Sequence, residues 1–346
     1  MKEEERDSKS DISADDKSNN QKAYLFKINE IKYSYASSIS PNSFIVFKSI
    51  GEIPYIIYTN FAGNLITYNI LRNQKINEIY LRKPVNNIYY LFDTYQKKDL
   101  IMTQNSNYIE IYDFINFICL FNLKIENIQQ SYLFINKNEI NIVVAVKRIG
   151  FENNYIISYN LDSKKICEFS NDSKMTFYMM HFFDKIINEN VILICNENNI
   201  NIYKHLYNIY KNYNDNNNII NINHITIIEY NNKTKIVSAC LDNNIRIWDY
   251  YDEGLLYKIT IYGTKLNTIF HCKNNIFVAG NCLIILENTN VIQIITEIQN
   301  KNVIQILNEN KNEIVAINKI NHPLIGDIIL TQGYKFGEII FWKINY

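Results

Sequence analysis

The segment DNNIRIWD, Asp242 to Asp249, decides the fold of this 346-residue chain. It begins with turn residues, continues with Ile at alternate positions, and ends with an aromatic residue followed by an acidic one. Alternation of this kind is typical of a β-strand, because successive side chains point to opposite faces of a sheet. The segment therefore predicts a tight turn followed by a short strand.

The same pattern recurs along the chain. The other copies are AGNLITYN (62–69), SNYIEIYD (106–113), NNYIISYN (153–160), ENNINIYK (197–204), TNVIQIIT (289–296) and FGEIIFWK (336–343). The aromatic position is occupied by Tyr68, Tyr112, Tyr159, Tyr203, Trp248, Ile295 and Trp342, at intervals of 44, 47, 44, 45, 47 and 47 residues. This period predicts a repeat architecture, in which each unit buries its faces only against its neighbours.

Two further positions of the repeat have a physical meaning. The turn position is always Gly or Asn, which adopt positive φ more readily than other residues; it is held by Gly63, Asn107, Asn154, Asn198, Asn243, Asn290 and Gly337. The residue three before the aromatic position is always Leu or Ile, as in Leu65 and Ile245. Each copy is therefore predicted to be a hairpin turn followed by a strand with one apolar face.

Short apolar runs fill the rest of the chain and predict an all-β protein. Examples are FIVF (44–47), YIIY (55–58), NIVVAV (141–146) and KIVSAC (235–240), which have the length and the β-branched and aromatic residues of strands. The Asn-rich run from Asn212 to Asn223 is interpreted as a surface loop.

The repeat resembles the WD40 family of β-propellers, whose units have four strands and often end in Trp-Asp. In the most typical copy, Ser238, Asp242 and Trp248 match three places of the hydrogen-bond network of that family, whereas His224 does not match the fourth. The last copy has Phe336 where the family has Asp. The resemblance implies a divergent WD40-like β-propeller, for which we expect seven blades, with six or eight as alternatives.

The two ends of the chain predict how such a ring would close. Residues 1–21 form a polar, charged segment that we expect to be a disordered tail, and residues 22–346 a single propeller domain. The last repeat has no fourth strand after it, whereas the segment KAYLFKIN (22–29) precedes the first repeat and is strand-like. An N-terminal strand that completes the last blade would remove an open sheet edge.

Composition limits the function classes. There are 35 Lys and Arg against 35 Asp and Glu, so the chain lacks the basic surplus of a dedicated nucleic-acid or acidic-membrane binder. No secretory signal and no apolar run of bilayer length is present. The six scattered cysteines indicate reduced thiols, so we expect a cytoplasmic or nuclear protein that neither is secreted nor spans a membrane.

Residues that could carry chemistry are few. The five histidines are His181, His205, His224, His271 and His322, and none lies in a catalytic motif. The best candidate metal group, His271 with Cys272 and Cys282, lacks a fourth ligand. Cys195 and Cys240 each lie eight residues before the aromatic position, which favours strand packing. We therefore predict no catalytic, cofactor-binding or metal-binding residue and no cofactor.

Carboxylates from different blades could still converge, which a sequence does not show. Asp113, Asp242 and Asp249 are the candidates, and each occupies a repeat position that commonly caps a turn. The Lys164–Lys165 pair is expected to be solvated. Some of the 27 tyrosines could anchor an interface, because Tyr is enriched at binding hot spots.

The resemblance implies a non-catalytic scaffold that presents its faces and loops to other proteins or peptides, as one subunit of a complex. One alternative is a non-catalytic subunit of an RNA-processing or modifying complex, which would be the route to any contact with nucleic acid. A second alternative is an enzyme with a site in the central channel, which clustered carboxylates or histidines would favour.

Overall fold

The computed structural model describes residues 24–345, except 33–43, 61–62, 82–83, 137–138, 149, 152–153, 162–164, 172–175, 197–198, 205–207, 216–220, 231–232, 262–264, 273–274, 281–282, 288–302, 308–313 and 334–337. The described residues form strands and turns, and no helix occurs among them. Accordingly, no described segment is a helix long and apolar enough to cross a membrane.

The strands form seven four-stranded antiparallel sheets. We number them 1 to 7 in chain order, starting from β2; β1 belongs to sheet 7. Sheet 1 contains β2 (Phe44–Lys48), β3 (Pro54–Thr59), β4 (Asn64–Asn69) and β5 (Gln74–Tyr80); sheet 2 contains β6 (Asn87–Asp93), β7 (Lys98–Gln104), β8 (Tyr108–Asp113) and β9 (Cys119–Lys124); sheet 3 contains β10 (Ile128–Asn136), β11 (Glu139–Lys147), β12 (Asn154–Asn160) and β13 (Lys165–Asn171); sheet 4 contains β14 (Thr176–Asp184), β15 (Glu189–Asn196), β16 (Asn199–Lys204) and β17 (Asn208–Asn214). Sheet 5 contains β18 (Ile222–Tyr230), β19 (Lys233–Cys240), β20 (Asn244–Asp249) and β21 (Leu255–Thr260); sheet 6 contains β22 (Leu266–Cys272), β23 (Asn275–Gly280), β24 (Leu283–Glu287) and β25 (Val303–Leu307); sheet 7 contains β26 (Ile314–His322), β27 (Gly326–Gly333), β28 (Glu338–Asn345) and β1 (Tyr24–Lys32).

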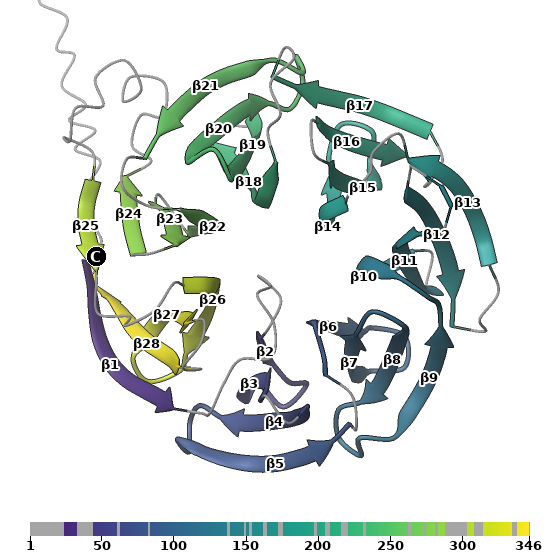
Figure 1. The fold of residues 1–346 in the computed structure, drawn as a ribbon. Coiled ribbons are helices and arrows are strands. Elements are labelled where there is room, and N and C mark those ends of the chain that lie inside the picture. The colour runs from purple at the N-terminus through teal and green to yellow at the C-terminus, as the bar shows by residue number, and fades with distance from the viewer. Residues whose placement is uncertain are drawn as a thin grey trace, which may run out of the picture.

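The sheets are arranged around a common centre as a β-propeller, with the first strand of each sheet innermost (Figure 1). The apolar core lies between neighbouring sheets. Ile245 and Ile247 of β20 pack with residues of β22 in sheet 6, whereas Trp248 packs with β16 and β17 of sheet 4. Ile245 and Ile247 thus form the predicted apolar face of this strand. The other face, with Asn244, Arg246 and Trp248, is also buried, because a sheet of a propeller is covered on both sides.

A shift of register marks the repeat in every sheet. The third and fourth strands lose register at the aromatic position, for example between Ile247 and Trp248, where β21 carries one extra residue, Leu256. Equivalent shifts occur in all the other sheets. A β-bulge of this kind bends the outer strand and disturbs its free edge.

The register shift shows that the sixth copy of the repeat does not lie where the sequence pattern placed it. The sequence pattern placed it at Thr289–Thr296, with Ile295 at the aromatic position, but these residues lie outside the described part of the chain. The third strand of sheet 6 is β24, and its register shift falls at Leu286. The assumption of a constant period failed here because 15 residues, 288–302, separate β24 from β25.

The strand from the N-terminal end pairs with the strand at the other end of the chain. β1 is the outermost strand of sheet 7 and is antiparallel to β28, from Tyr24 opposite Asn345 to Lys32 opposite Glu338. Its register shift lies between Lys27 and Asn29, opposite Trp342. β1 thus occupies the place that the fourth strand has in each of the other sheets. It extends three residues beyond the predicted segment 22–29.

Positive φ at the turn position of the repeat occurs at Gly63 (80°) and Asn243 (61°) but not at Asn107 or Asn154, where the prediction was wrong. In the turn at Asn107, the side chain of Asn105 stabilises the backbone by accepting the N–H of Asn107 at 2.9 Å. Asn154 is already the first residue of β12, and Gly150 takes the positive φ (85°) of a longer turn. Asn198, Asn290 and Gly337 lie outside the described residues.

The hydrogen-bond network implied by the WD40 resemblance is partly present. The indole Nε1–H of Trp248 donates to Ser238 Oγ at 3.3 Å, and Trp342 donates equivalently to Thr331 Oγ1 at 2.9 Å. Asp242 is not part of this network, because its carboxylate binds the guanidinium of Arg246 at 2.9 and 2.7 Å. The predicted loop Asn212–Asn223 is shorter than expected, since β17 ends at Asn214 and β18 begins at Ile222.

Candidate functional site: capped apolar turns on one face

The antiparallel order of the strands gives the molecule two different ends. Within each sheet, the turns that follow the first and third strands lie at one end, and the turn that follows the second strand lies at the other. We call the end with the first and third turns the turn face, and the other end the opposite face.

Six turns of the turn face share one local structure. A side chain at the end of the preceding strand accepts backbone N–H groups two or three residues later. At Asp93, for example, Oδ1 accepts the N–H groups of Tyr95 (2.9 Å) and Gln96 (3.1 Å). The other caps are Asn69, Asp113, Asp184, Asp249 and His322. Such side-chain caps satisfy N–H groups that a strand end leaves without a partner.

The same six turns also share a left-handed residue four positions after the cap. These residues are Asn73, Lys97, Phe117, Asn188, Glu253 and Gly326, with φ between 51° and 83°. Only one of them is Gly, although positive φ is costly for residues that have a Cβ atom. The cap and the left-handed residue together fix the backbone of each turn.

An apolar side chain occupies the position two residues after the cap, at the apex of the turn. We call these residues the tips; five of them have exposed fractions, relative to the free residue, of 84% (Leu324), 77% (Tyr95), 69% (Ile115), 63% (Ile186) and 40% (Leu71). The sixth, Tyr251, is half-buried. Exposure of this extent costs hydrophobic free energy in the isolated protein, since burial of an Ile or Leu side chain contributes about 1.5–3 kcal/mol.

Exposed apolar residues are unevenly distributed between the two faces. Besides the tips, Ile50, Ile118 and Ile325 are exposed in turns of the turn face. On the opposite face, the described turns expose only Phe151 and Leu241, and Tyr80 ends the strand that precedes a linker. The turn face has two turns per sheet and the opposite face one, and the most exposed apolar side chains of the described turns lie on the turn face.

Buried carboxylates join the turn face across sheet boundaries. Asp99 of sheet 2 accepts the backbone N–H of Ile50 in sheet 1 at 2.9 Å and the hydroxyl of Tyr90 at 2.8 Å. Asp184 of sheet 4 likewise accepts the hydroxyl of Tyr250 from sheet 5. Burial and the neighbouring carboxylate raise the pKa of both tyrosines, so their hydroxyls remain donors at neutral pH. On the turn face, these hydrogen bonds therefore link sheet 1 to sheet 2 and sheet 4 to sheet 5.

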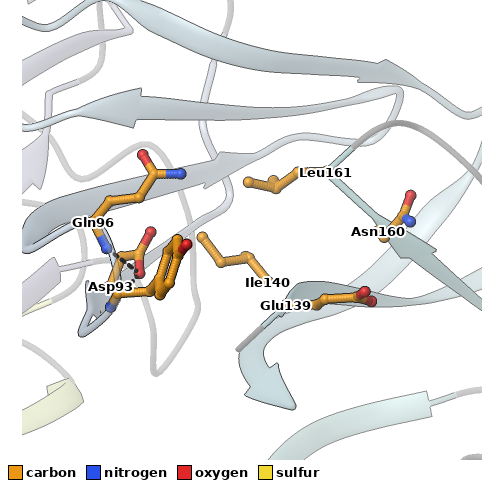
Figure 2. Close-up of a pocket in the computed structure, with 7 residues that line it drawn as sticks. Asp93, Gln96, Glu139, Ile140, Asn160 and Leu161 are labelled. Carbon is orange, nitrogen blue, oxygen red and sulfur yellow. Dashed lines mark hydrogen bonds between the residues drawn. The ribbon is translucent and has the colours of Figure 1, made fainter. Parts of the chain in front are cut away.

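A hollow of about 180 Å³ lies on this face between sheets 2 and 3. Asp93 and Gln96 border it on one side and Glu139 and Asn160 on the other, with Ile140 and Leu161 between them (Figure 2). The tip Tyr95 also lines the hollow. Sites for small-molecule ligands usually measure about 300–1,000 Å³, so the size of this hollow suits a single side chain of a partner better than a substrate.

The carboxylates singled out in the sequence lie apart and cap turns, as predicted. Asp113 and Asp249 cap tips on sheets 2 and 5. Asp242 lies on the opposite face, where it accepts the N–H of Asn244 at 3.2 Å in addition to binding Arg246. Lys165 pairs with Glu168 at the surface. No two of the three aspartates are brought together.

The histidines are also dispersed. His181 contacts Asn190 at 3.0 Å, His224 accepts the N–H of Ile269 at 3.4 Å, and His322 caps a turn. His271 lies on β22 and His205 lies outside the described residues.

Of the proposed metal group, the side chain of Cys272 and all of Cys282 are likewise undescribed. The residues that are described contain no group of three potential ligands.

Cys195 and Cys240 lie in the same apolar cluster, between sheets 4 and 5, which confirms their packing role. The prediction that they share one repeat position was wrong. Cys195 pairs with Ile200, whereas the equivalent Ile245 pairs with Ala239, because the hairpin after β19 is one residue longer. Burial raises the pKa of both thiols, to about 11 for Cys240, so both are protonated at neutral pH.

Sequence reasoning missed four of the caps: Asn69, Asp93, Asp184 and His322. A signal was available, because Asp93 and Asp184 each end an apolar run and precede an apolar residue by two positions, as Asp113 and Asp249 do. The repeat pattern covers only the third strand of each sheet, whereas Asp93, Asp184 and His322 end first strands.

Comparison with known proteins shows the fold but no family. No family model matches the chain, and no curated protein matches its sequence. Among solved structures, one of BBS1N in complex with ARL6DN, soaked with mercury, has a TM-score of 0.68 at 9% identity over 93% of this chain and 97% of the other. A second of the same complex, soaked with lead, has a TM-score of 0.69 at 8% identity over the same shares. The chain is thus similar in fold to a β-propeller crystallised with a protein partner.

Proposed function

We propose that this protein is a non-catalytic scaffold that docks partner proteins on its turn face. We infer further that the seven sheets are the seven blades of a divergent WD40-type ring, closed by β1. The equivalent register shift in every sheet, including the pair of β1 with β28, supports this inference. A closed ring would hold the turns of all blades at fixed positions, which is what a docking surface requires.

The concentration of exposed tips on one face carries the proposal. Leu324, Tyr95, Ile115 and Ile186 are each more than 60% exposed, and each is held by a capped turn. Turns whose backbone is already fixed lose little conformational entropy on binding, and Tyr, Ile and Leu offer large apolar contact areas. A partner that covers these tips recovers the hydrophobic free energy that the free protein forgoes.

The experiment compares two surface variants of the full chain. The tip variant carries Tyr95→Ser, Ile115→Ser, Ile186→Ser and Leu324→Ser. The matched control carries Tyr80→Ser, Phe151→Ser and Leu241→Ser, which remove exposed apolar side chains at the other end of the molecule. Affinity purification with mass spectrometry from cells that express each variant should show that the control keeps the partners of the unaltered protein and the tip variant loses them.

Two results would contradict the proposal. Retention of the same partners by the tip variant would show that docking occurs elsewhere. Purification of the protein alone, together with turnover of a small molecule, would show that it is an enzyme. Unchanged melting temperatures in both variants would establish that a loss of partners does not come from unfolding.

A further inference from the structure

The cap of the first turn in sheet 7 differs chemically from the other caps. Asp93, Asp113, Asp184 and Asp249 accept two backbone N–H groups each through a carboxylate oxygen, and Asn69 accepts one through its amide oxygen. In sheet 7 the acceptor is an imidazole nitrogen. Nδ1 of His322 accepts the N–H groups of Leu324 at 3.1 Å and Ile325 at 3.3 Å.

An imidazole nitrogen can fill this place only while it is unprotonated. In the neutral ring, Nδ1 is an acceptor when the proton is on Nε2. In the imidazolium ion both nitrogens carry protons, so Nδ1 would direct a donor at two N–H donors. A carboxyl group, by contrast, keeps an acceptor oxygen in either protonation state, and an Asn amide oxygen accepts at any ordinary pH.

No ion pair with a neighbouring charged residue would offset the loss of the Nδ1 acceptor when the imidazole of His322 is protonated. On its own hairpin, Lys319 and Asp327 pair with each other at 3.1 Å, and in neighbouring sheet 1, Lys48 pairs with Glu52 at 3.4 Å. No described carboxylate forms an ion pair or hydrogen bond with His322. Burial of the ring lowers the pKa of His322 below its ordinary value, which favours the neutral imidazole and hence the capped turn at neutral pH.

We propose that His322 makes the sheet 7 part of the turn face sensitive to pH: its protonation releases the backbone of Leu324 and Ile325, while the Asp-capped tips stay fixed. Leu324 is the most exposed tip of the molecule, and Ile325 beside it is also exposed. If the turn face docks partners as proposed above, on which this consequence rests, binding that uses Leu324 weakens in mild acid and binding that uses Tyr95 or Ile115 does not.

The test is hydrogen exchange of the full chain, followed by mass spectrometry between pH 5 and pH 7.5 and corrected for intrinsic exchange rates. For the unaltered protein, we expect protection of the peptide that covers residues 322–327 to fall by about three- to tenfold on acidification, the range for losing hydrogen bonds of ordinary strength. The peptide that covers residues 93–98, with its Asp cap, should keep its protection and serves as the internal control.

Variants of His322 distinguish two causes of lost amide protection in acid, which are protonation of His322 and destabilisation of the whole protein. His322→Asn supplies a neutral acceptor without adding charge, as Asn69 does in sheet 1, and should abolish the pH dependence while keeping protection at pH 7.5. His322→Ala should show low protection at every pH. Histidine resonances of the full chain, compared with those of the Asn variant, give the pKa of His322 directly.

Either of two outcomes would overturn the proposal: protection of residues 322–327 that does not change with pH in the unaltered protein, or an equal fall in the His322→Asn variant. None of these measurements involves a partner. A negative result would therefore leave the docking function standing, and failure of the docking function would leave the chemistry of this turn unaffected.

Discussion

Trp248 and Ser238 are joined across the two middle strands of sheet 5 by an indole N–H that donates to a hydroxyl at 3.3 Å, and neither side chain is exposed to solvent. Ser238→Ala leaves the indole N–H without its partner in a dry interior, so we expect the free energy of unfolding to fall by about 1–3 kcal/mol. Chemical denaturation measures this change.

Ser238→Thr is the matched control for this pair, because Thr331 has the equivalent role beside Trp342. It should cost less than the Ala variant. Equal stability of Ser238→Ala and the unaltered protein would show that the hydrogen bond contributes nothing.

Lys97 has a φ of 52° and is exposed. Gly adopts this conformation without the cost that a Cβ atom brings, and in sheet 7 the same place is held by Gly326. Lys97→Gly should therefore raise the free energy of unfolding by about 0.5–1 kcal/mol. The neighbouring Lys98 begins β7 and has no positive φ, so Lys98→Gly should destabilise. A loss of stability in both variants, measured by thermal unfolding, would contradict the proposed strain.

His224 should make the stability of the whole protein depend on pH. Its Nδ1 accepts the N–H of Ile269 at 3.4 Å, its ring lies 4.4 Å from that of Tyr178, and burial lowers its pKa to about 4. Because this pKa is below the unfolded value of about 6.5, the unfolded chain binds the proton more tightly. The contribution is therefore complete above pH 6.5 and is lost as the pH falls towards 4, by at most about 3 kcal/mol.

Denaturation curves of the unaltered protein and of His224→Asn, which keeps an acceptor but does not titrate, measure this contribution between pH 4.5 and 7.5. The difference in stability between the two proteins should change with pH. A constant difference would show that His224 does not titrate in this range.

Removal of β1 tests the pairing of the chain ends. Deletion of residues 1–20 leaves β1 intact and should leave the melting temperature unchanged. Deletion of residues 1–30 removes most of β1 and exposes the edge of β28, from Glu338 to Asn345, so the melting temperature should fall. Equal melting temperatures for the two truncations would refute the role of β1 in holding sheet 7.

Local pattern in the sequence predicted the strands well, because alternation and turn residues act within a few positions. The expected copies overlap the third strands of sheets 1–5 and 7, and the indole of Trp248 donates to Ser238 as the resemblance implied. The sixth copy of the repeat was misplaced because Leu283–Glu287 lacks an aromatic residue, so that the average spacing, and not the local pattern, determined its predicted position.

The candidate site was less accessible to sequence reasoning than the fold. The cap of an apolar tip involves residues two or three apart, and Asp-x-Ile in isolation occurs in any Asn- and Ile-rich chain. What distinguishes Asp113 and Ile115 is that five other turns repeat the arrangement, a relation that depends on which strand ends share a face. His322 could not have been recognised as a cap, because no carboxylate marks that turn.

The partnership of Tyr24 with Asn345 has a consequence for biosynthesis. A ribosome makes β1 before the other three strands of sheet 7, and β28, which β1 must join, follows more than three hundred residues later. The nascent chain can stack one sheet on the next as it emerges, but β1 has no partner strand until β28 has been made. During this interval its backbone needs another partner or the protection of a chaperone, so the rate of translation, and not only the sequence, should influence how much native protein a cell obtains.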